Sequence, residues 1–122
     1  MIPESYKKLI ETLIEKNESG KSSWNETSVK NQYKLILNNG MIVLTCKTVL
    51  LPDSRIISLD IYDNAGMLVG SFSADALLSK SDYALLNELY KSILHFKEQK
   101  VDKQIYILMN EIRTSDKIGK ED

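Results

Sequence analysis

A thiol activated by an imidazole is a common arrangement for nucleophilic catalysis, and this chain has one residue of each type, Cys46 and His95. A single histidine excludes a metal site built on two histidines. Cys46 falls on the apolar face of a predicted strand, where cysteine usually behaves as a small buried hydrophobe. No sequence signal brings His95 near it. We therefore expect an inward-facing, inert thiol without a basic neighbour, and we predict no catalytic residues.

Two short motifs resemble ligand-binding loops, but both lack required residues. Residues 20–22 read Gly-Lys-Ser, as at the end of a phosphate-binding loop, but Glu15 stands where that pattern needs its first glycine. Residues 60–66 loosely resemble a calcium loop, but Tyr62 occupies a ligand position and Phe72 replaces the closing glutamate. Both segments are better interpreted as turns, so we predict no metal and no cofactor.

The composition of the chain bounds its class. It has 122 residues, of which 43% are hydrophobic and 27% charged, and 16 basic residues nearly balance 17 acidic ones. These values predict one globular domain over residues 1–122, without the strong field that steers nucleic acid or membrane binding. The N-terminus does not resemble a secretory signal, and no apolar run approaches the length of a membrane span. With its single thiol, the chain is expected to be cytoplasmic.

The elements that must position any site are predicted from periodicity. Apolar residues recur at helical spacing near the N-terminus, which predicts a helix over residues 4–18; they are Tyr6, Leu9, Ile10, Leu13 and Ile14. A short edge strand is expected within residues 22–27. Trp24 in that segment either caps the core beside the first helix or anchors a partner.

Two β-hairpins are predicted in the middle of the chain. Asn39-Gly40 is a typical two-residue hairpin loop, and it would place Leu35 opposite Leu44. The core face of this hairpin would then carry Tyr33, Leu35, Leu37, Ile42, Leu44 and Cys46. A link over residues 51–54 leads to the second hairpin, whose predicted four-residue loop at 63–66 sets the register of its strands. That register pairs Ile61 with Leu68, Leu59 with Gly70 and Ile57 with Phe72.

The last third of the chain is predicted to be helical. Ser81 is a suitable N-cap before Asp82, and apolar residues continue at helical spacing to Ile112. A polar stretch at residues 97–100 leaves two alternatives, one long helix over 82–113 or a helix pair, and the absence of Gly and Pro favours the single helix. Residues 114–122 form a predicted frayed tail. The fold class is therefore α+β: an N-terminal helix, an antiparallel meander of four to five strands in two hairpins, and a long C-terminal helix or helix pair.

The predicted outer face of the sheet is more apolar than a solvated face should be. It would carry Ile36, Met41, Val43, Tyr62, Met67 and Val69, mixed with Lys34, Thr45, Lys47 and Asp60. Two explanations remain open. One of the chain's own helices covers this face in a three-layer domain, or the face is a homodimer or partner surface.

The sequence thus favours a non-catalytic protein–protein interaction module, such as an adaptor, a chaperone-like protein or an inhibitor, acting with a protein partner or by self-association. One alternative is a nucleic-acid binder that uses Lys30, Lys34 and Lys47 with Tyr62 as a stacking platform. Another is a small enzyme that uses carboxylates, for instance Asp60 with Glu88 or Asp75.

Overall fold

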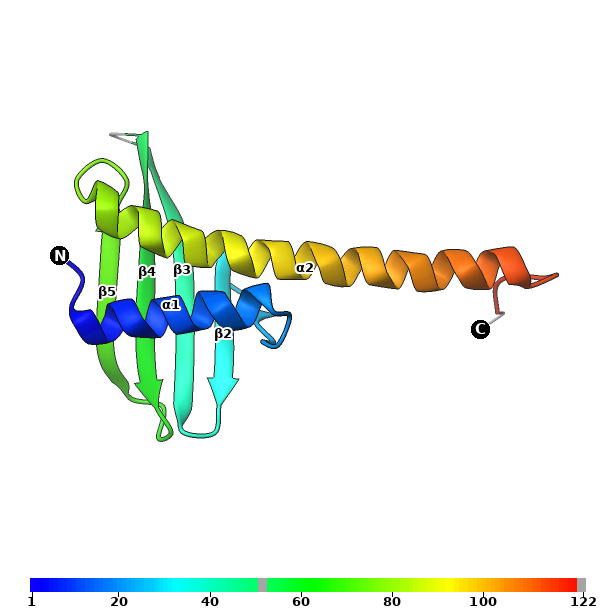
Figure 1. Ribbon diagram of the computed structural model, residues 1–122, viewed down its shortest axis with the longest axis horizontal. Coiled ribbons are helices and arrows are strands. Elements are labelled where there is room, and N and C mark those ends of the chain that lie inside the picture. Colours follow the sequence, from blue (N-terminus) through cyan, green and yellow to red (C-terminus); the bar gives the residue numbers. More distant parts are fainter. Residues whose placement is uncertain (51–52, 121–122) are drawn as a thin grey trace.

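The computed structural model describes residues 1–50 and 53–120. It is an α+β fold in which an N-terminal helix, a five-stranded antiparallel meander and a long C-terminal helix follow in chain order (Figure 1). The elements are α1 (Glu4–Glu18), β1 (Asn25–Glu26), β2 (Gln32–Leu37), β3 (Gly40–Leu50), β4 (Asp53–Asp63), β5 (Leu68–Asp75) and α2 (Lys80–Thr114). The strands lie in sequence order, β1-β2-β3-β4-β5. The predicted fold class is confirmed.

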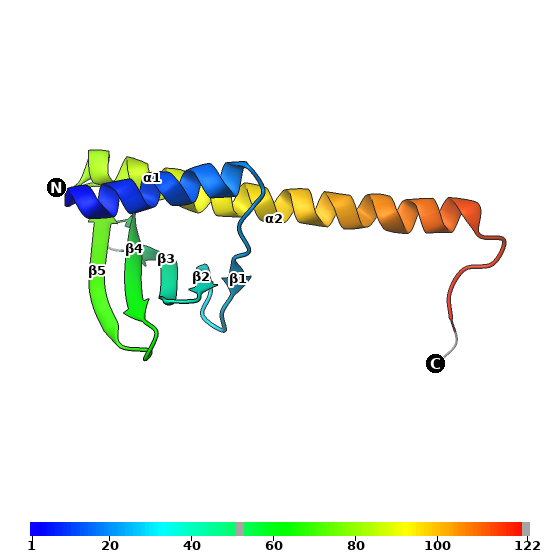
Figure 2. The ribbon, with the colours of Figure 1, turned by 60° about the horizontal axis from the view of Figure 1, so that its bottom comes forward.

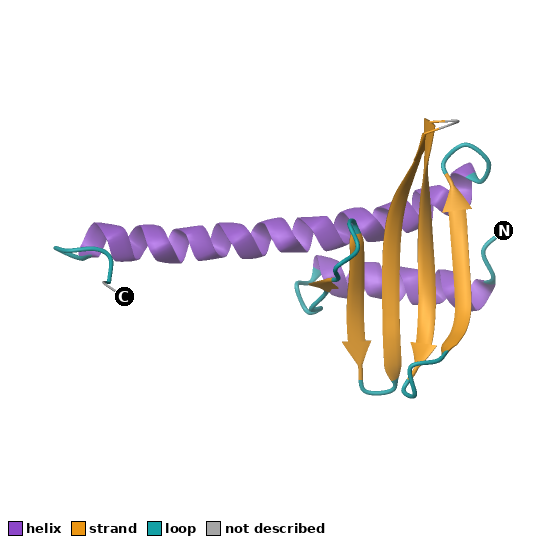
Figure 3. Ribbon diagram, turned by 180° about the vertical axis from the view of Figure 1, so that it is seen from behind, coloured by secondary structure: helices purple, strands orange, loops and turns teal. Residues whose placement is uncertain are grey.

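The fold has two layers. Both helices lie on the same face of the sheet, side by side (Figures 1 and 2), and the view from behind shows the other face without a helix over it (Figure 3). The idea that one of the chain's own helices covers the outer face is therefore wrong. The reason is that both apolar helix stripes are used on one side of the sheet.

The core lies between the helix layer and the sheet. The stripe of α1 buries Ile10, Leu13 and Ile14, as its spacing predicts, and α1 begins and ends where expected. The other buried apolar side chains come from the inner face of the sheet and from α2, and include Tyr33, Leu35, Ile42, Leu44, Cys46, Ile57, Leu59, Leu86, Leu89 and Ile93.

The first predicted hairpin exists, but its register differs by two residues. Leu35 pairs with Ile42, and Leu44 pairs with Tyr33. Neither Asn39 nor Gly40 has a positive φ angle, so these residues do not form the expected turn. Gly40 is instead the first residue of β3, where a side chain would collide with the carbonyl oxygen of Tyr62 on β4. A shift of two leaves every side chain on its predicted face, because strand side chains alternate.

The second hairpin also differs in register from its prediction. Ile61 pairs with Gly70 and Leu59 with Phe72, and an irregularity in the ladder follows between Ile61 and Tyr62. A β-bulge of this kind adds a residue to one strand, which sequence alternation alone does not reveal. Leu68 is paired with Tyr62 rather than with Ile61, and it is exposed.

The expected link over residues 51–54 is shorter than predicted. Asp53 and Ser54 already belong to β4, and β3 continues to Leu50, so β3 and β4 form one long hairpin. Leu51 and Pro52 lie outside the described residues. The predicted edge strand in 22–27 is the two-residue strand β1, which pairs with β2 at Lys34 and Tyr33.

The C-terminal helix is a single helix, as favoured, but it begins earlier than expected. It starts at Lys80 after Ser79, so Ser81 is not its N-cap. Asp82 in its first turn instead accepts a hydrogen bond from the backbone N–H of Ile2 and lies 3.3 Å from the N-terminal amine. Residues 115–120 of the predicted tail belong to no helix or strand.

Candidate functional site

The apolar residues of the outer face gather at one end of the sheet. Strand pairing places Ile36, Met41, Tyr62 and Leu68 in one row across β2, β3, β4 and β5. Met67 and Val69 flank this row in the second hairpin. Ile36, Met67 and Val69 are 62%, 66% and 63% exposed, and Met41 and Tyr62 are half-buried. We call these residues the hairpin-end patch: Ile36, Met41, Tyr62, Met67, Leu68 and Val69.

Val43, which the sequence placed among the candidate partner residues, does not belong to the patch. It faces outward but is only 7% exposed. It lies on the central strand β3, paired with Lys34 on β2 and Asp60 on β4. Neighbouring side chains on both sides of a central strand, here with the long Lys34 on one side, cover a short one between them, so Val43 is shielded within its own chain. The other five candidate residues, including Ile36 and Val69, lie together in the patch.

The rest of the outer face is mostly polar and internally hydrogen-bonded, although it also holds Val43 and Ile56. The Ser71 hydroxyl donates to the Asp60 carboxylate at 2.6 Å, and the Gln32 amide donates to the Thr45 hydroxyl at 2.9 Å. Lys34 lies in the same paired row as Asp60. The face therefore has an apolar end and a mostly polar remainder, a division that side-chain alternation along single strands does not predict.

The residues of the nucleic-acid alternative do not form one basic surface. Lys34 lies one row from Tyr62, but its row also holds the acidic Asp60. Lys47 is six residues along β3 from the row of Tyr62, a separation of about 20 Å at ~3.3 Å per residue. Lys30 lies in the loop before β2. An opposite charge near the central lysine weakens the positive field that phosphate binding requires.

The carboxylates of the enzymatic alternative are also not brought together. Asp60 is on the outer face of the sheet, whereas Glu88 is on α2 in the helix layer on the other side. Asp75 ends β5, where its carboxylate accepts hydrogen bonds from the backbone N–H of Leu77 at 2.7 Å and from the Ser54 hydroxyl at 2.9 Å. The bond from Leu77, and then that from Ser54, holds the pKa of Asp75 below its ordinary value. This carboxylate organises the turn that leads into α2.

Cys46 is buried, as predicted, but it does have a basic neighbour. The Arg55 guanidinium donates a hydrogen bond to the Cys46 sulfur at 3.0 Å and lies 5.6 Å from the ring centre of Tyr90. This hydrogen bond raises the pKa of Arg55, and burial raises the pKa of Tyr90. The expectation of no basic neighbour is thus wrong. The signal was the pairing of β3 with β4, which sets Thr48 opposite Arg55 and so places Arg55 near Cys46.

His95 is exposed on α2, where its imidazole contacts the Gln99 amide at 3.0 Å. Cys46 is covered within the core, so the structure does not expose the two as a nucleophile pair. Within residues 1–50 and 53–120, no cluster of three His, Cys, Asp or Glu side chains has the geometry to hold a metal ion.

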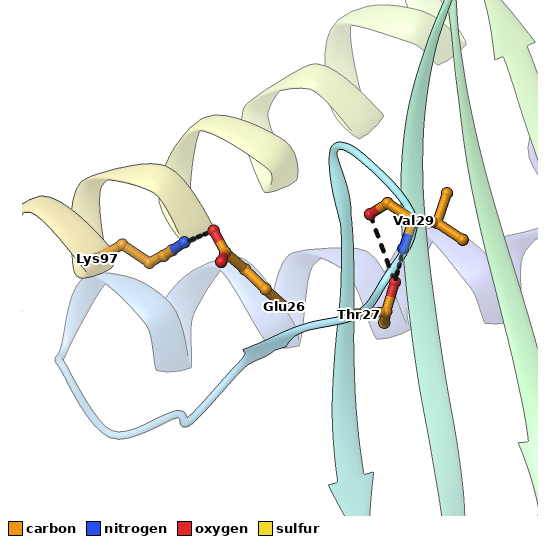
Figure 4. Close-up of polar contacts among 4 residues, drawn as sticks. All are labelled: Glu26, Thr27, Val29 and Lys97. Atoms are coloured by element: carbon orange, nitrogen blue, oxygen red, sulfur yellow. Dashed lines mark hydrogen bonds and ion pairs between the residues drawn. The ribbon is translucent and has the colours of Figure 1, made fainter.

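A ladder of side chains fixes the middle of α2 to the sheet. Tyr90 packs against Tyr33 of β2 with ring centres 6.2 Å apart, and the Lys97 ammonium lies 5.0 Å from the Tyr33 ring centre. Lys97 also forms an ion pair with Glu26 of β1 (Figure 4). In the next loop, the Val29 N–H donates to the Thr27 hydroxyl, which shapes the turn toward β2 (Figure 4). Through its pairing with β2 and the ion pair of Glu26 with Lys97, β1 joins the sheet to α2.

A second anchor joins α1, α2 and Trp24. Asn17 is only 3% exposed, and its side-chain oxygen accepts hydrogen bonds from the Trp24 indole N–H at 2.8 Å and from the Ser22 hydroxyl. Its amide nitrogen donates to the Ser92 hydroxyl on α2 at 2.9 Å. Trp24 is therefore a core residue, the first of its two predicted roles. Sequence analysis missed the role of Asn17, because a polar residue near a helix end is usually exposed.

Among the described residues, no helix has the length and hydropathy needed to cross a membrane. Comparison of the chain with models of known protein families, with curated proteins and with solved structures finds no match.

Proposed function

We propose that this protein is a non-catalytic protein–protein interaction module that binds another protein through the hairpin-end patch. One observation carries the proposal: a continuous apolar row crosses four strands on the uncovered face of the sheet. Contiguous exposed apolar surface is typical of interaction sites. Each exposed side chain of this size forgoes about 1.5–3 kcal/mol that burial would supply.

The surroundings of the patch support the same proposal. Asn38, Asn39 and Asn64 in the two hairpin turns are exposed beside it, and the row of Lys34 and Asp60 borders its other side. An apolar centre with a polar rim is the usual anatomy of a protein interface. The partner we expect is a protein that presents apolar side chains to the patch and polar groups to this rim.

Rigidity of the patch also favours binding. It lies on paired strands, and the turn between β4 and β5 is fixed by the Asp63 carboxylate, which accepts the N–H groups of Ala65 and Met67. A surface that is already ordered loses little conformational entropy when a partner binds.

The experiment is an affinity capture with three forms of the chain. Val69→Asp places a charge in the patch, and Ser5→Asp adds the same charge on exposed α1 in the helix layer. We expect a partner protein to be retained by wild type and by Ser5→Asp. Val69→Asp should weaken its binding affinity at least about tenfold, a penalty of ~1.4 kcal/mol or more. Circular dichroism of both variants tests whether they are folded. Equal retention by all three forms would contradict the proposal.

A further inference from the structure

The second half of α2 extends beyond the rest of the protein. Lys97 is anchored by Glu26 (Figure 4), and from Glu98 to Thr114 every residue of the helix is exposed. Figures 1 and 2 show this half projecting away from the sheet and from α1. At ~1.5 Å per residue it is about 25 Å long. A helix of this length is marginally stable alone in water, because most helical stability in proteins comes from packing of an apolar face.

This projecting half carries such a face. Val101, Ile105, Leu108 and Ile112 follow one another at spacings of four, three and four residues, and Leu94 precedes Val101 by seven. We call these five residues the α2 seam. Alternating spacings of three and four are the heptad pattern by which two helices pack together, and β-branched isoleucine alternating with leucine favours two strands.

Beyond Leu94, which is partly buried against the chain's own core, the seam is accessible to another helix. At ~100° per residue, it lies about a quarter-turn from Leu86, Leu89 and Ile93, which are buried against the sheet. On the opposite flank, Ser92 is bonded to α1 through Asn17. The seam is therefore on the flank of α2 that faces away from α1. A surface hollow of about 290 Å³ marks its beginning, lined by Leu94, Lys97, Glu98, Val101 and Asp102.

We propose that a second copy of this chain occupies the α2 seam, so that the protein is a homodimer through the projecting halves of its two α2 helices. A two-fold dimer needs the same surface on both copies to be complementary to itself, and a heptad seam has that property. The charges beside it in the projecting half are of both signs, Lys100 as well as Glu98, Asp102 and Glu111, so no block of like charge opposes the approach of two copies.

The area of the seam suits such a dimer. Val101, Ile105, Leu108 and Ile112 are 57%, 47%, 47% and 55% exposed, and Met109 beside them is 38% exposed. Each would remove on the order of 80–100 Å² from water. Two copies together would bury about 800–1,000 Å² from these five side chains, which is close to the lower limit for a specific interface. A dimer that depends on protein concentration follows from this size.

This dimer is separate from the hairpin-end patch, so either proposal can fail alone. The test is sedimentation equilibrium of the full chain over roughly a hundredfold range of concentration. The seam variant combines Ile105→Lys with Leu108→Lys. Its matched control combines Tyr106→Lys with Ile107→Lys, two apolar residues that are 75% and 59% exposed on other sides of the same helix turn.

We expect the wild-type chain to dimerise within that range, and the seam variant to weaken dimerisation at least tenfold. The control should stay within about twofold of wild type, since a tenfold change in affinity requires the loss of real contacts. Loss of helical circular dichroism in the seam variant should accompany dissociation. A wild type that is monomeric throughout, or equal weakening by the seam and control variants, would overturn the proposal.

Discussion

Replacement of the buried Asn17 by alanine should lower the free energy of unfolding by about 2–4 kcal/mol. Most of that loss comes from Trp24, because its buried indole N–H would lose the acceptor that it contacts at 2.8 Å. A buried donor left without a partner costs about 1–3 kcal/mol. The Ser92 hydroxyl retains its bond to the Leu89 carbonyl at 2.7 Å, and Ser22 is half-exposed and can turn to water, so these two add less.

Urea denaturation at one fixed protein concentration measures this change, with the single tryptophan as fluorescent probe. Asn110→Ala, at an exposed position on α2, is the matched control and should change stability by no more than about 0.5 kcal/mol. A double-mutant cycle with Trp24→Phe, followed by circular dichroism, should show a coupling of about 1–2 kcal/mol. An Asn17→Ala variant as stable as Asn110→Ala would refute the argument that this side chain joins α1, α2 and Trp24.

Three further predictions follow from burial and hydrogen bonding. Leu44→Ala should lower the free energy of unfolding by about 2–5 kcal/mol in urea denaturation, because Leu44 is fully buried. Leu37→Ala, at a half-exposed position, should lower it by less than about 1 kcal/mol. Equal losses of stability would contradict the observed core. Cys46 in the native protein should react with a thiol reagent only at the rate of unfolding, because it is buried, and labelling as fast as in urea would show otherwise. The pKa of Asp75 is lower in the folded state than its ordinary value of 3.8, so its ionised carboxylate stabilises the fold at a pH above 3.8. This contribution is lost as the pH falls through the lower folded pKa, so the stability deficit of Asp75→Asn should shrink in acid. A deficit that is independent of pH would refute this.

The sequence predicted the elements of this fold because each has a strong local periodicity. The helix α1 and the inward faces of β2, β3 and β4 follow from side-chain alternation and from the 3.6-residue helical period. Register was predicted less well, because it depends on contacts between strands. Glycine is a typical turn residue, but Gly40 is a glycine because a side chain there would collide with the backbone of β4. The alternation retained the correct faces even though both hairpin registers were wrong.

The candidate surface shows the same division between local and long-range information. Alternation placed Ile36, Val43 and Val69 on one face, but it gave no measure of how neighbouring strands shield a residue, so it did not predict the low exposure of Val43. The predicted core face is wrong at its two ends for a related reason. Leu37 and Leu68 lie near the hairpin turns, and both are more than half exposed. Arg55 was missed because its contact with Cys46 needs the pairing of β3 with β4.

The most direct test of the proposed function is photo-crosslinking from the hairpin-end patch. A photoreactive amino acid is placed at Val69 in the patch or at Lys8, which is exposed on α1 in the helix layer. Each labelled protein is irradiated in an extract of cells that contain the natural chain. We expect a covalent adduct with another protein from position 69 that Ile36→Asp abolishes, and no such adduct from position 8. Adducts of equal yield from both positions, or none from position 69, would contradict it.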